Sequence, residues 1–316
     1  MWNENEHEQA REVLRTPRDC LRWAETLMRR EQVVLGHGTD DYWDEALAML
    51  LHCLHLPWDT DPRMLDARLL PHEVDAFLAL LRKRVNERVP TAYLTGRAWF
   101  CGLEFRVDPR VLIPRSPTAE LIERGMAPFV DPERVARVLD LGTGSGCMAI
   151  ACAHAFPEAQ VDAADVSEAA LEVCRDNIAF HEMEEQVRPI ISDGLASVQG
   201  PYDLILSNPP YVNAAEMAAL PEEYRHEPEL ALAAGEDGLD FVRRLLCEAP
   251  EQLAEDGVLV VEVGNSWDAV ERNWPEVPFF WFEFERGGHG VFMLDRNQLL
   301  EYRHVFAASE RAPARQ

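Results

Sequence analysis

The residues Asn208-Pro209-Pro210-Tyr211 follow directly on the apolar run Tyr202–Ser207. Each proline fixes φ, lacks a backbone N–H and favours an extended predecessor, so the tetrapeptide is expected to form a rigid ledge. The side-chain oxygen of Asn208 and the backbone oxygen of Pro209 are two acceptors, enough to hold both hydrogens of a planar NH2 group. The Tyr211 ring is expected to lie against that plane. Because asparagine and proline are also ordinary turn residues, an inert loop remains an equally good interpretation of the tetrapeptide alone.

A glycine-rich loop lies upstream of this motif. The apolar run Val138–Leu141 opens into Gly142-Thr143-Gly144-Ser145-Gly146, and Cys147–Ala153 is expected to continue as a helix. Strand, glycine loop and helix in this order let the backbone approach a ligand at a helix N-terminus. The spacing differs from that of dinucleotide and phosphate loops, and no lysine follows. This favours a ligand that meets the loop with an amino-acid or sugar group rather than a triphosphate.

Two acidic residues follow the next two expected strands. Asp165 ends Ala159–Asp165, where an acid typically binds the ribose hydroxyls of an adenosine ligand. An alternative is that Asp165-Val166-Ser167 only caps the helix expected over Glu168–Phe180. Asp193 follows Val187–Ile191 and is expected to accept the adenine amino group. The loop, both acids and the tetrapeptide all fall at the carboxyl ends of strands, where open α/β sheets bind ligands.

Together these features resemble class I S-adenosylmethionine-dependent methyltransferases. More narrowly, the chain resembles the protein-(glutamine-N5) methyltransferases that modify release factors and a large-subunit ribosomal protein. Val111–Ile122 matches the segment that precedes the catalytic domain in that family. Arg115–Glu120 departs from the Arg-Pro-Glu-Thr-Glu of the release-factor branch, and with Leu220–Leu232 and Glu262–Ser266 it points to the branch that acts on large-subunit ribosomal protein number three. The resemblance covers roughly Leu80 to Arg303.

The resemblance implies a Rossmann-like α/β fold with a mostly parallel seven-stranded sheet and a small helical N-terminal domain. It implies S-adenosylmethionine as cofactor and a basic ribosomal protein as partner, with a release factor as the alternative substrate. Asn208, Pro209 and Tyr211 are then the predicted catalytic residues, and with Pro210 they form the predicted substrate site. The predicted cofactor-binding residues are Gly142, Thr143, Gly144, Ser145, Gly146, Asp165, Asp193 and Asn208.

The chemistry of methyl transfer agrees with this assignment. Transfer from a sulfonium to nitrogen is an in-line displacement whose leaving group departs neutral, so no general acid is needed. The obstacle is a primary amide, whose lone pair is delocalised into its carbonyl. Acceptors from Asn208 and Pro209 would raise the electron density on nitrogen and aim it at the methyl carbon. Orientation of this kind can supply roughly 7–11 kcal/mol.

Charge separates the candidate substrates. The 316 residues include 30 Lys and Arg against 56 Asp and Glu, a net charge of −26. A protein that grips duplex DNA neutralises phosphates with basic side chains, so this balance disfavours a DNA or RNA adenine methyltransferase, although a local basic patch is compatible with it. Acidity attracts a basic protein partner, but it also serves solubility alone, and the two explanations weigh about equally.

The expected compartment is the cytoplasm. The start, Met1–Glu8, is acidic and lacks the apolar stretch of a signal peptide, and no apolar run approaches membrane-spanning length. Seven dispersed cysteines without a Cys-x-x-Cys pair indicate reduced thiols. No membrane association and no specific DNA binding are expected.

Three regions and a tail are predicted. Residues 1–88 are expected to form a helical domain, with helices over Arg18–Val34, Tyr42–Leu54 and Val74–Glu87. The resemblance implies that this domain recognises the substrate. Residues 89–130 form a connector with a β-hairpin built from Trp99–Phe105 and Val111–Ile113. Residues 131–306 form the catalytic domain, ending in an antiparallel pair over Phe279–Phe284 and Gly290–Leu294. Residues 307–316 are expected to be a disordered tail.

Several further residues are given minor roles. His52, Cys53 and His55 share a helix without a fourth ligand nearby, so no metal site is predicted. His226 follows the tetrapeptide after a polar loop that could close over the site, where it could act as a base, but this chemistry does not need one. Arg225 and Glu227 are assigned structural or substrate contacts. A cofactor-binding protein without catalysis is a third possibility, against which the intact tetrapeptide counts.

Overall fold

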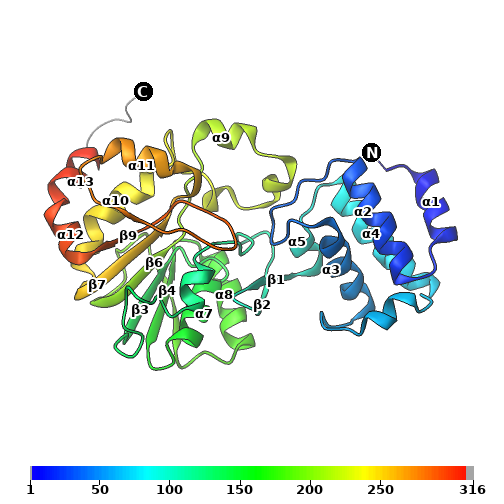
Figure 1. Cartoon of the computed structure of the whole chain (residues 1–316), viewed down its shortest axis with the longest axis horizontal. Coiled ribbons are helices and arrows are strands. Elements are labelled where there is room, and N and C mark those ends of the chain that lie inside the picture. Colours follow the sequence, from blue (N-terminus) through cyan, green and yellow to red (C-terminus); the bar gives the residue numbers. More distant parts are fainter. Residues whose placement is uncertain (1, 311–316) are drawn as a thin grey trace. The chain divides into compact units, whose positions relative to one another are not determined.

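The computed structural model describes residues 2–310 (Figure 1), which divide into two compact units. The first comprises the chain up to Ala98 together with Pro221–His226. The second comprises Trp99–Leu220 and the chain from Glu227 onward. The limits expected at residues 88, 130 and 306 stay predictions about the functional division of the chain.

The first unit is helical. It contains α1 (Glu4–Val13), α2 (Pro17–Arg30), α3 (Tyr42–Leu54), α4 (Pro71–Asn86) and α5 (Thr91–Thr95), with short 3-10 turns at Pro62–Asp66 and Glu222–His226. Thr16 caps α2 and accepts a hydrogen bond from Asp19 N, with Pro17 at the first helical position. The apolar faces of α2, α3 and α4 form one buried core, which includes Leu27, Leu50 and Phe77. Helix α1 was not predicted from the sequence, because its apolar residues are too few to give a helical period.

A buried ionic cluster holds Pro221–His226 within this unit. Arg84 and Glu45 are both fully buried, and Arg84 Nε donates to Glu45 Oε2 at 2.7 Å. Glu223 Oε1 accepts a hydrogen bond from Val34 N at 2.9 Å. The same oxygen lies 3.5 Å from Arg84 Nη1 and 3.5 Å from Arg88 Nη1. Because buried charges persist only when paired, this cluster fixes the course of the segment.

The second unit is built on one sheet, and in the described chain its strand order is β5-β4-β3-β6-β7-β9-β8. The strands are β3 (Arg137–Leu141), β4 (Gln160–Asp165), β5 (Val187–Ile191), β6 (Tyr202–Ser207), β7 (Leu253–Glu262), β8 (Phe280–Trp281) and β9 (Val291–Asp295). The first five are mutually parallel, whereas β9 runs antiparallel to β7 and to β8. This confirms the predicted α/β fold with a mostly parallel seven-stranded sheet.

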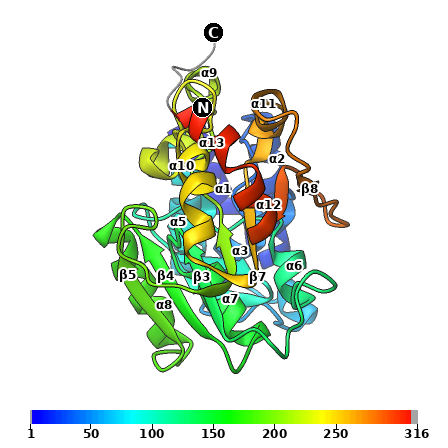
Figure 2. The same ribbon diagram turned by 90° about the vertical axis from the view of Figure 1, so that its left-hand side faces the viewer.

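Helices cover both faces of the sheet (Figure 2). One hydrophobic cluster joins the sheet to α6 (Ala119–Glu123), α7 (Cys147–Ala155) and α8 (Glu168–Phe180). The other joins it to α10 (Asp240–Glu248), α11 (Trp267–Asn273), α12 (Arg296–Glu301) and α13 (Arg303–Glu310). The short helix α9 (Ala214–Ala219) has no buried residue. The strand order reverses between β3 and β6, so a crevice forms at their carboxyl ends.

Two local predictions were wrong. A two-stranded hairpin forms from β1 (Arg97–Phe100) and β2 (Leu103–Arg106), but Val111–Ile113 is not a strand. The predicted disordered tail is helical as far as Glu310, because α13 continues through residues 307–310. Ser309 explains this order, since its hydroxyl accepts a hydrogen bond from Trp274 Nε1 at 3.0 Å and donates to Phe306 O. Residues 311–316 lie outside the described part of the chain.

No helix in residues 2–310 has both the length and the apolar character required to cross a bilayer.

Candidate active site

The glycine loop lies between β3 and α7. Gly142, Gly144 and Gly146 have φ values of 77°, 54° and 81°, a left-handed region in which other residues are strained. Gly142 N and Thr143 N donate to Ala164 O at 2.8 and 3.0 Å, which ties the loop to β4. A Cβ at Gly146 would lie 2.7 Å from Cys174 Sγ, so a side chain is also excluded by packing. The loop therefore has one backbone course, which brings it to the carboxyl edge of the sheet.

Asp165 ends β4 beside this loop. Its two carboxylate oxygens accept hydrogen bonds from Gly144 N at 2.9 Å and from Ser167 N at 2.8 Å. Ser167, and not Asp165, caps α8, because its hydroxyl accepts from Ala170 N. Burial raises the pKa of Asp165, and the backbone hydrogen bonds oppose this shift. The carboxylate is thus positioned by the loop and also lines the cavity described below.

Asp193, after β5, is held less firmly. Its side chain is 72% exposed and pairs with Arg244, whose Nη1 lies 2.7 Å from Asp193 Oδ1. The neighbouring Ser192 is buried and donates to Gly194 O at 2.7 Å. Asp193 lies at the same sheet edge as Asp165, but its carboxylate is already engaged by a cation.

Strand β6 delivers the Asn208-Pro209-Pro210-Tyr211 motif to the same edge. Ser207, the last residue of β6, donates from its hydroxyl to Leu141 O at 2.8 Å, which locks β6 against β3. Asn208, Pro209 and Pro210 line the cavity. Within residues 2–310 the Asn208 side chain makes no hydrogen bond, so its amide is available to a ligand.

Tyr211 is placed differently from the rest of the motif. It is not among the residues that line the cavity. Its hydroxyl donates to Glu262 Oε1 at 3.1 Å, and its carbonyl accepts from Ser266 Oγ at 2.8 Å. Its role as a stacking surface stays a prediction, and its contacts show that its ring orientation is set by β7 and the residues after it.

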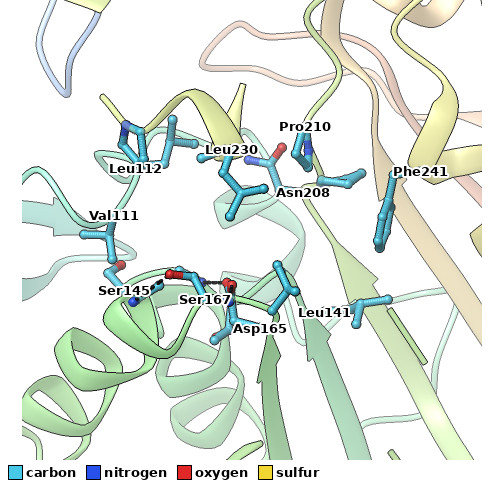
Figure 3. A pocket seen from close by; sticks show the side chains of 18 of the residues that line it. Val111, Leu112, Leu141, Ser145, Asp165, Ser167, Asn208, Pro210, Leu230 and Phe241 are labelled. Carbon is cyan, nitrogen blue, oxygen red and sulfur yellow. Dashed lines mark hydrogen bonds between the residues drawn. The ribbon is translucent and has the colours of Figure 1, made fainter. Parts of the chain in front are cut away.

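These residues surround one cavity of about 450 Å³ in the second unit (Figure 3). Figure 3 shows Asn208 and Pro210 on one side of it and Asp165 with Ser167 on the other. All five residues of the glycine loop except Gly146 line it as well. The structure therefore brings together the predicted loop, both predicted acids and three residues of the motif.

Apolar side chains supply most of the remaining wall. None of them is predicted from the sequence as a site residue, because an apolar residue that lines a cavity has the same character as one in the core. These residues include Val111, Leu112, Leu141, Val166, Leu230 and Phe241.

The wall that contains Val111 and Leu112 is held by a buried ion pair. Arg115 Nη1 and Nη2 donate to Glu227 Oε1 and Oε2 at 2.6 and 2.7 Å, and Glu227 Oε1 also accepts from Ile113 N at 3.1 Å. The Glu227 side chain is fully buried. Bidentate pairs of this kind are strong and directional. Glu227 thus has the structural contact expected of it, whereas Arg225 is exposed and belongs to the first unit.

Asp140 is a second buried acid, and its hydrogen bonds stabilise the glycine loop. Asp140 Oδ2 accepts hydrogen bonds from Thr143 Oγ1 at 2.6 Å and Ala149 N at 3.0 Å. Burial raises the pKa of Asp140 to about 7, against the effect of these two hydrogen bonds. Asp140 joins the start of the loop to α7 and was missed as a site residue, although its place directly before Leu141-Gly142 is a signal that could have found it.

Gly264 is expected to be essential for the position of Tyr211. Its φ is 44°, and a Cβ there would lie 2.6 Å from the Tyr211 ring. Gly264→Ala should therefore cost backbone strain and also displace the ring, for a loss of about 1–2 kcal/mol beyond the strain alone. Gly287→Ala is the matched control, because Gly287 has φ 87° and no atom lies within 4 Å of its Cβ position. Urea unfolding of both variants measures the difference, and equal losses would contradict the prediction.

The arrangement can bind a small-molecule ligand, and the side-chain oxygen of Asn208 suits a planar NH2 group. The glycine loop and Asp165 offer backbone and carboxylate contacts for the polar part of a ligand, and the apolar wall offers a dry surface. Asn208 and Pro209 also line the cavity, and Figure 3 shows Asn208 on the side opposite Asp165. Within the described residues no group of His, Cys, Asp and Glu is arranged to hold a metal ion.

Comparison with known proteins also indicates methyl transfer. Residues 125–223 match the methyltransferase small domain family. The ribosomal protein uL3 glutamine methyltransferase of Bordetella pertussis is 50% identical over 293 residues, which are 92% of this chain and 98% of that protein. The protein of the same name from Neisseria gonorrhoeae is 48% identical over the same coverage.

One solved structure that the chain matches is the catalytic domain of hMettl16 in complex with a MAT2A 3'UTR hairpin. It has a TM-score of 0.49 and 17% identity, and the match covers 71% of this chain and 80% of that one. The two bacterial relatives match almost end to end and at far higher identity. The chain belongs to the family of ribosomal protein uL3 glutamine methyltransferases.

Proposed function

We propose that this protein transfers the methyl group of S-adenosylmethionine to the N5 atom of a glutamine side chain in ribosomal protein uL3. One observation carries the proposal. Asn208 and Pro209, whose oxygens suit a primary amide, line the same cavity as the glycine loop and Asp165. The relatives that bear this name, at 50% and 48% identity, support the choice of glutamine and of uL3.

The residues present fit S-adenosylmethionine. A cavity of about 450 Å³ is within the range of small-molecule sites, roughly 300–1,000 Å³. Asp165 would accept the ribose hydroxyls, and the left-handed glycines would let the backbone approach the amino-acid part of the ligand. Asp193 would accept from the adenine amino group at the sheet edge. When bound, this cofactor supplies an electrophilic methyl group on a sulfonium.

The chain's own residues then act on the acceptor amide. The Asn208 side-chain oxygen and the Pro209 carbonyl accept one N–H each, which orients the nitrogen and raises its electron density. Pro210 restricts the backbone of the Asn208–Tyr211 segment. Tyr211 lies at the end of the motif, where its ring would contact the plane of the amide. Water takes the proton after methylation, because the alkylated nitrogen has become acidic. These groups work by orientation, a contribution that reaches roughly 7–11 kcal/mol.

The acidic composition supports a basic protein acceptor. The net charge of −26 opposes the phosphate backbone of nucleic acid and complements a ribosomal protein rich in Lys and Arg. Electrostatic attraction of this kind is screened by salt. Methylation of uL3 is therefore expected to slow as ionic strength rises from about 0.05 M to 0.3 M, mainly through KM.

The test uses the full chain with methyl-labelled S-adenosylmethionine and one acceptor at a time: purified uL3, a peptide release factor, or duplex DNA. Label is expected in uL3 alone, and mass spectrometry should place it on one glutamine as N5-methylglutamine. Changing that glutamine to glutamate in uL3 should remove the label. Label in DNA alone or in the release factor alone would overturn the proposal.

A further inference from the structure

Glu262 is a buried carboxylate that lies between two sides of the candidate active site. It is the last residue of β7 and is 5% exposed. It is not among the residues that line the cavity. Both of its oxygens are engaged by hydroxyl groups from segments far away in the sequence.

The first partner is Tyr211, the end of the acceptor motif. Its hydroxyl donates to Glu262 Oε1 at 3.1 Å. The rest of Tyr211 is held by Ser266 Oγ, which donates to its carbonyl, and by Gly264, which lies against its ring. These two contacts fix the backbone and one ring face. The hydrogen bond to Glu262 fixes the far end of the ring.

The second partner is Ser116, whose hydroxyl donates to Glu262 Oε2. Ser116 is buried and lines the cavity on the wall that Arg115 and Glu227 also hold. The Ser116 hydroxyl lies 2.6 Å from Thr118 Oγ1, which in turn is 3.3 Å from the sulfur of Met148, another cavity residue. One carboxylate therefore joins the acceptor motif to the wall of the cavity.

Burying a carboxylate is costly, and a purely apolar residue would fill the space more cheaply. The cost is offset when each oxygen accepts a hydrogen bond and a cation lies nearby, as Arg115 does here. A carboxylate also spans two hydroxyls at a fixed separation, which two independent contacts would not do. The two hydrogen bonds of Glu262 therefore suit a residue that sets the distance between Tyr211 and Ser116.

We propose that Glu262 is a positioning residue for methyl transfer, which sets the gap between the acceptor motif and the facing wall by holding Tyr211 and Ser116 together. The inference rests on the proposed function, since it concerns how the glutamine amide is aligned. Glu262 acts through Tyr211 and not on the substrate. Its loss should therefore lower kcat and leave cofactor binding intact.

The test is a set of variants measured for kcat and KM with uL3 and for S-adenosylmethionine affinity by calorimetry. Glu262→Ala is expected to lower kcat by about 10²-fold, the scale of a misplacement of about 1 Å, with KM for uL3 changed by less than about threefold. Glu262→Gln should retain kcat within about fivefold, because its amide can accept from Tyr211 and donate to Ser116. Tyr211→Phe and Ser116→Ala each remove one of the two bonds and should each lower kcat by about tenfold.

A double-mutant cycle separates positioning from general stability. In the Tyr211→Phe background, Glu262→Ala should cost much less than it does in the native chain, because the hydrogen bond is already lost. Glu120→Ala is the matched control. Glu120 is another buried carboxylate of the second unit, accepting from Glu285 N and Arg286 N, and its loss should lower thermal stability but leave kcat within about twofold.

The outcomes distinguish this inference from the proposed function. A native chain that does not methylate uL3 sinks the proposed function. If the native chain is active, equal kcat losses in Glu262→Gln and Glu262→Ala, or full additivity with Tyr211→Phe, overturn the positioning role. Should Glu262→Ala fail to fold, the single variants Tyr211→Phe and Ser116→Ala decide, and unchanged kcat in both would also overturn it.

Discussion

Replacing Asn208 with alanine is expected to lower kcat by about 10²–10³-fold, the usual effect of removing one oriented hydrogen-bonding group from an active site. The Asn208 amide lines the cavity and makes no hydrogen bond within residues 2–310, so its removal leaves no protein partner unpaired. Thermal stability should therefore change little. Single-turnover methylation of uL3 measures the loss, and calorimetry with S-adenosylmethionine should show an almost unchanged Kd.

The control for this prediction is Asn213→Ala. Asn213 follows the same motif, but its side-chain oxygen caps α9 by accepting from Glu216 N at 2.9 Å. Its loss should cost about 1 kcal/mol of stability without changing kcat. If Asn208→Ala instead weakened cofactor binding as much as it lowered turnover, Asn208 would belong to the cofactor site and not to the acceptor site.

Replacing Asp165 with alanine is expected to weaken S-adenosylmethionine binding by about 100-fold or more. Two hydrogen bonds from ribose hydroxyls to a carboxylate contribute about 1.5–3 kcal/mol each, and tenfold in Kd is about 1.4 kcal/mol. The change also removes the acceptors of Gly144 N and Ser167 N, so the glycine loop loses one of its hydrogen bonds to β4 while those to Ala164 O remain. Calorimetric titration measures the affinity, and kcat at saturating cofactor should recover to within about tenfold.

Asp193→Ala is the comparison for Asp165. Asp193 is 72% exposed and is paired with Arg244, so much of its charge is already compensated. An exposed contact of this kind contributes about 1 kcal/mol or less, and the expected loss of cofactor affinity is below tenfold. A larger effect at Asp193 than at Asp165 would show that the two acids have been assigned in the wrong order of importance.

Local patterns in the sequence predict many of the residues that line the cavity, because the fold repeats one unit, a parallel strand followed by a helix. Each strand of a parallel sheet ends at the same edge, so the residues after Leu141, Asp165, Ile191 and Ser207 were expected to lie together, and they do. Helices with clear caps were predicted well for the same reason. Thr16-Pro17 marks the start of α2, and α3 spans Tyr42–Leu54 as expected.

Contacts between residues far apart in the sequence could not be predicted from it. Nothing in the residues around Tyr211 indicates that its hydroxyl meets Glu262, 51 positions later, or that Ser116 meets the same carboxylate across 146 positions. The helical course of residues 307–310 likewise depends on Ser309 and Trp274, which are 35 positions apart. Such hydrogen-bond partners depend on how helices and sheet pack together. Unlike helices and strands, this packing has no periodic pattern in the sequence that would reveal it.

The sequence by itself determined the class of fold and the edge of the sheet at which the glycine loop, Asp165 and Asn208 meet, because backbone stiffness, glycine spacing and strand ends are local properties. Only the tertiary structure decided which side chains complete the site. Phe241 and Leu230 became cavity wall, Tyr211 turned toward β7, and Glu262 joined the two sides. The physical reason is that hydrogen-bond pairing and burial depend on neighbours in space, and those are settled only when the two faces of the sheet have been covered.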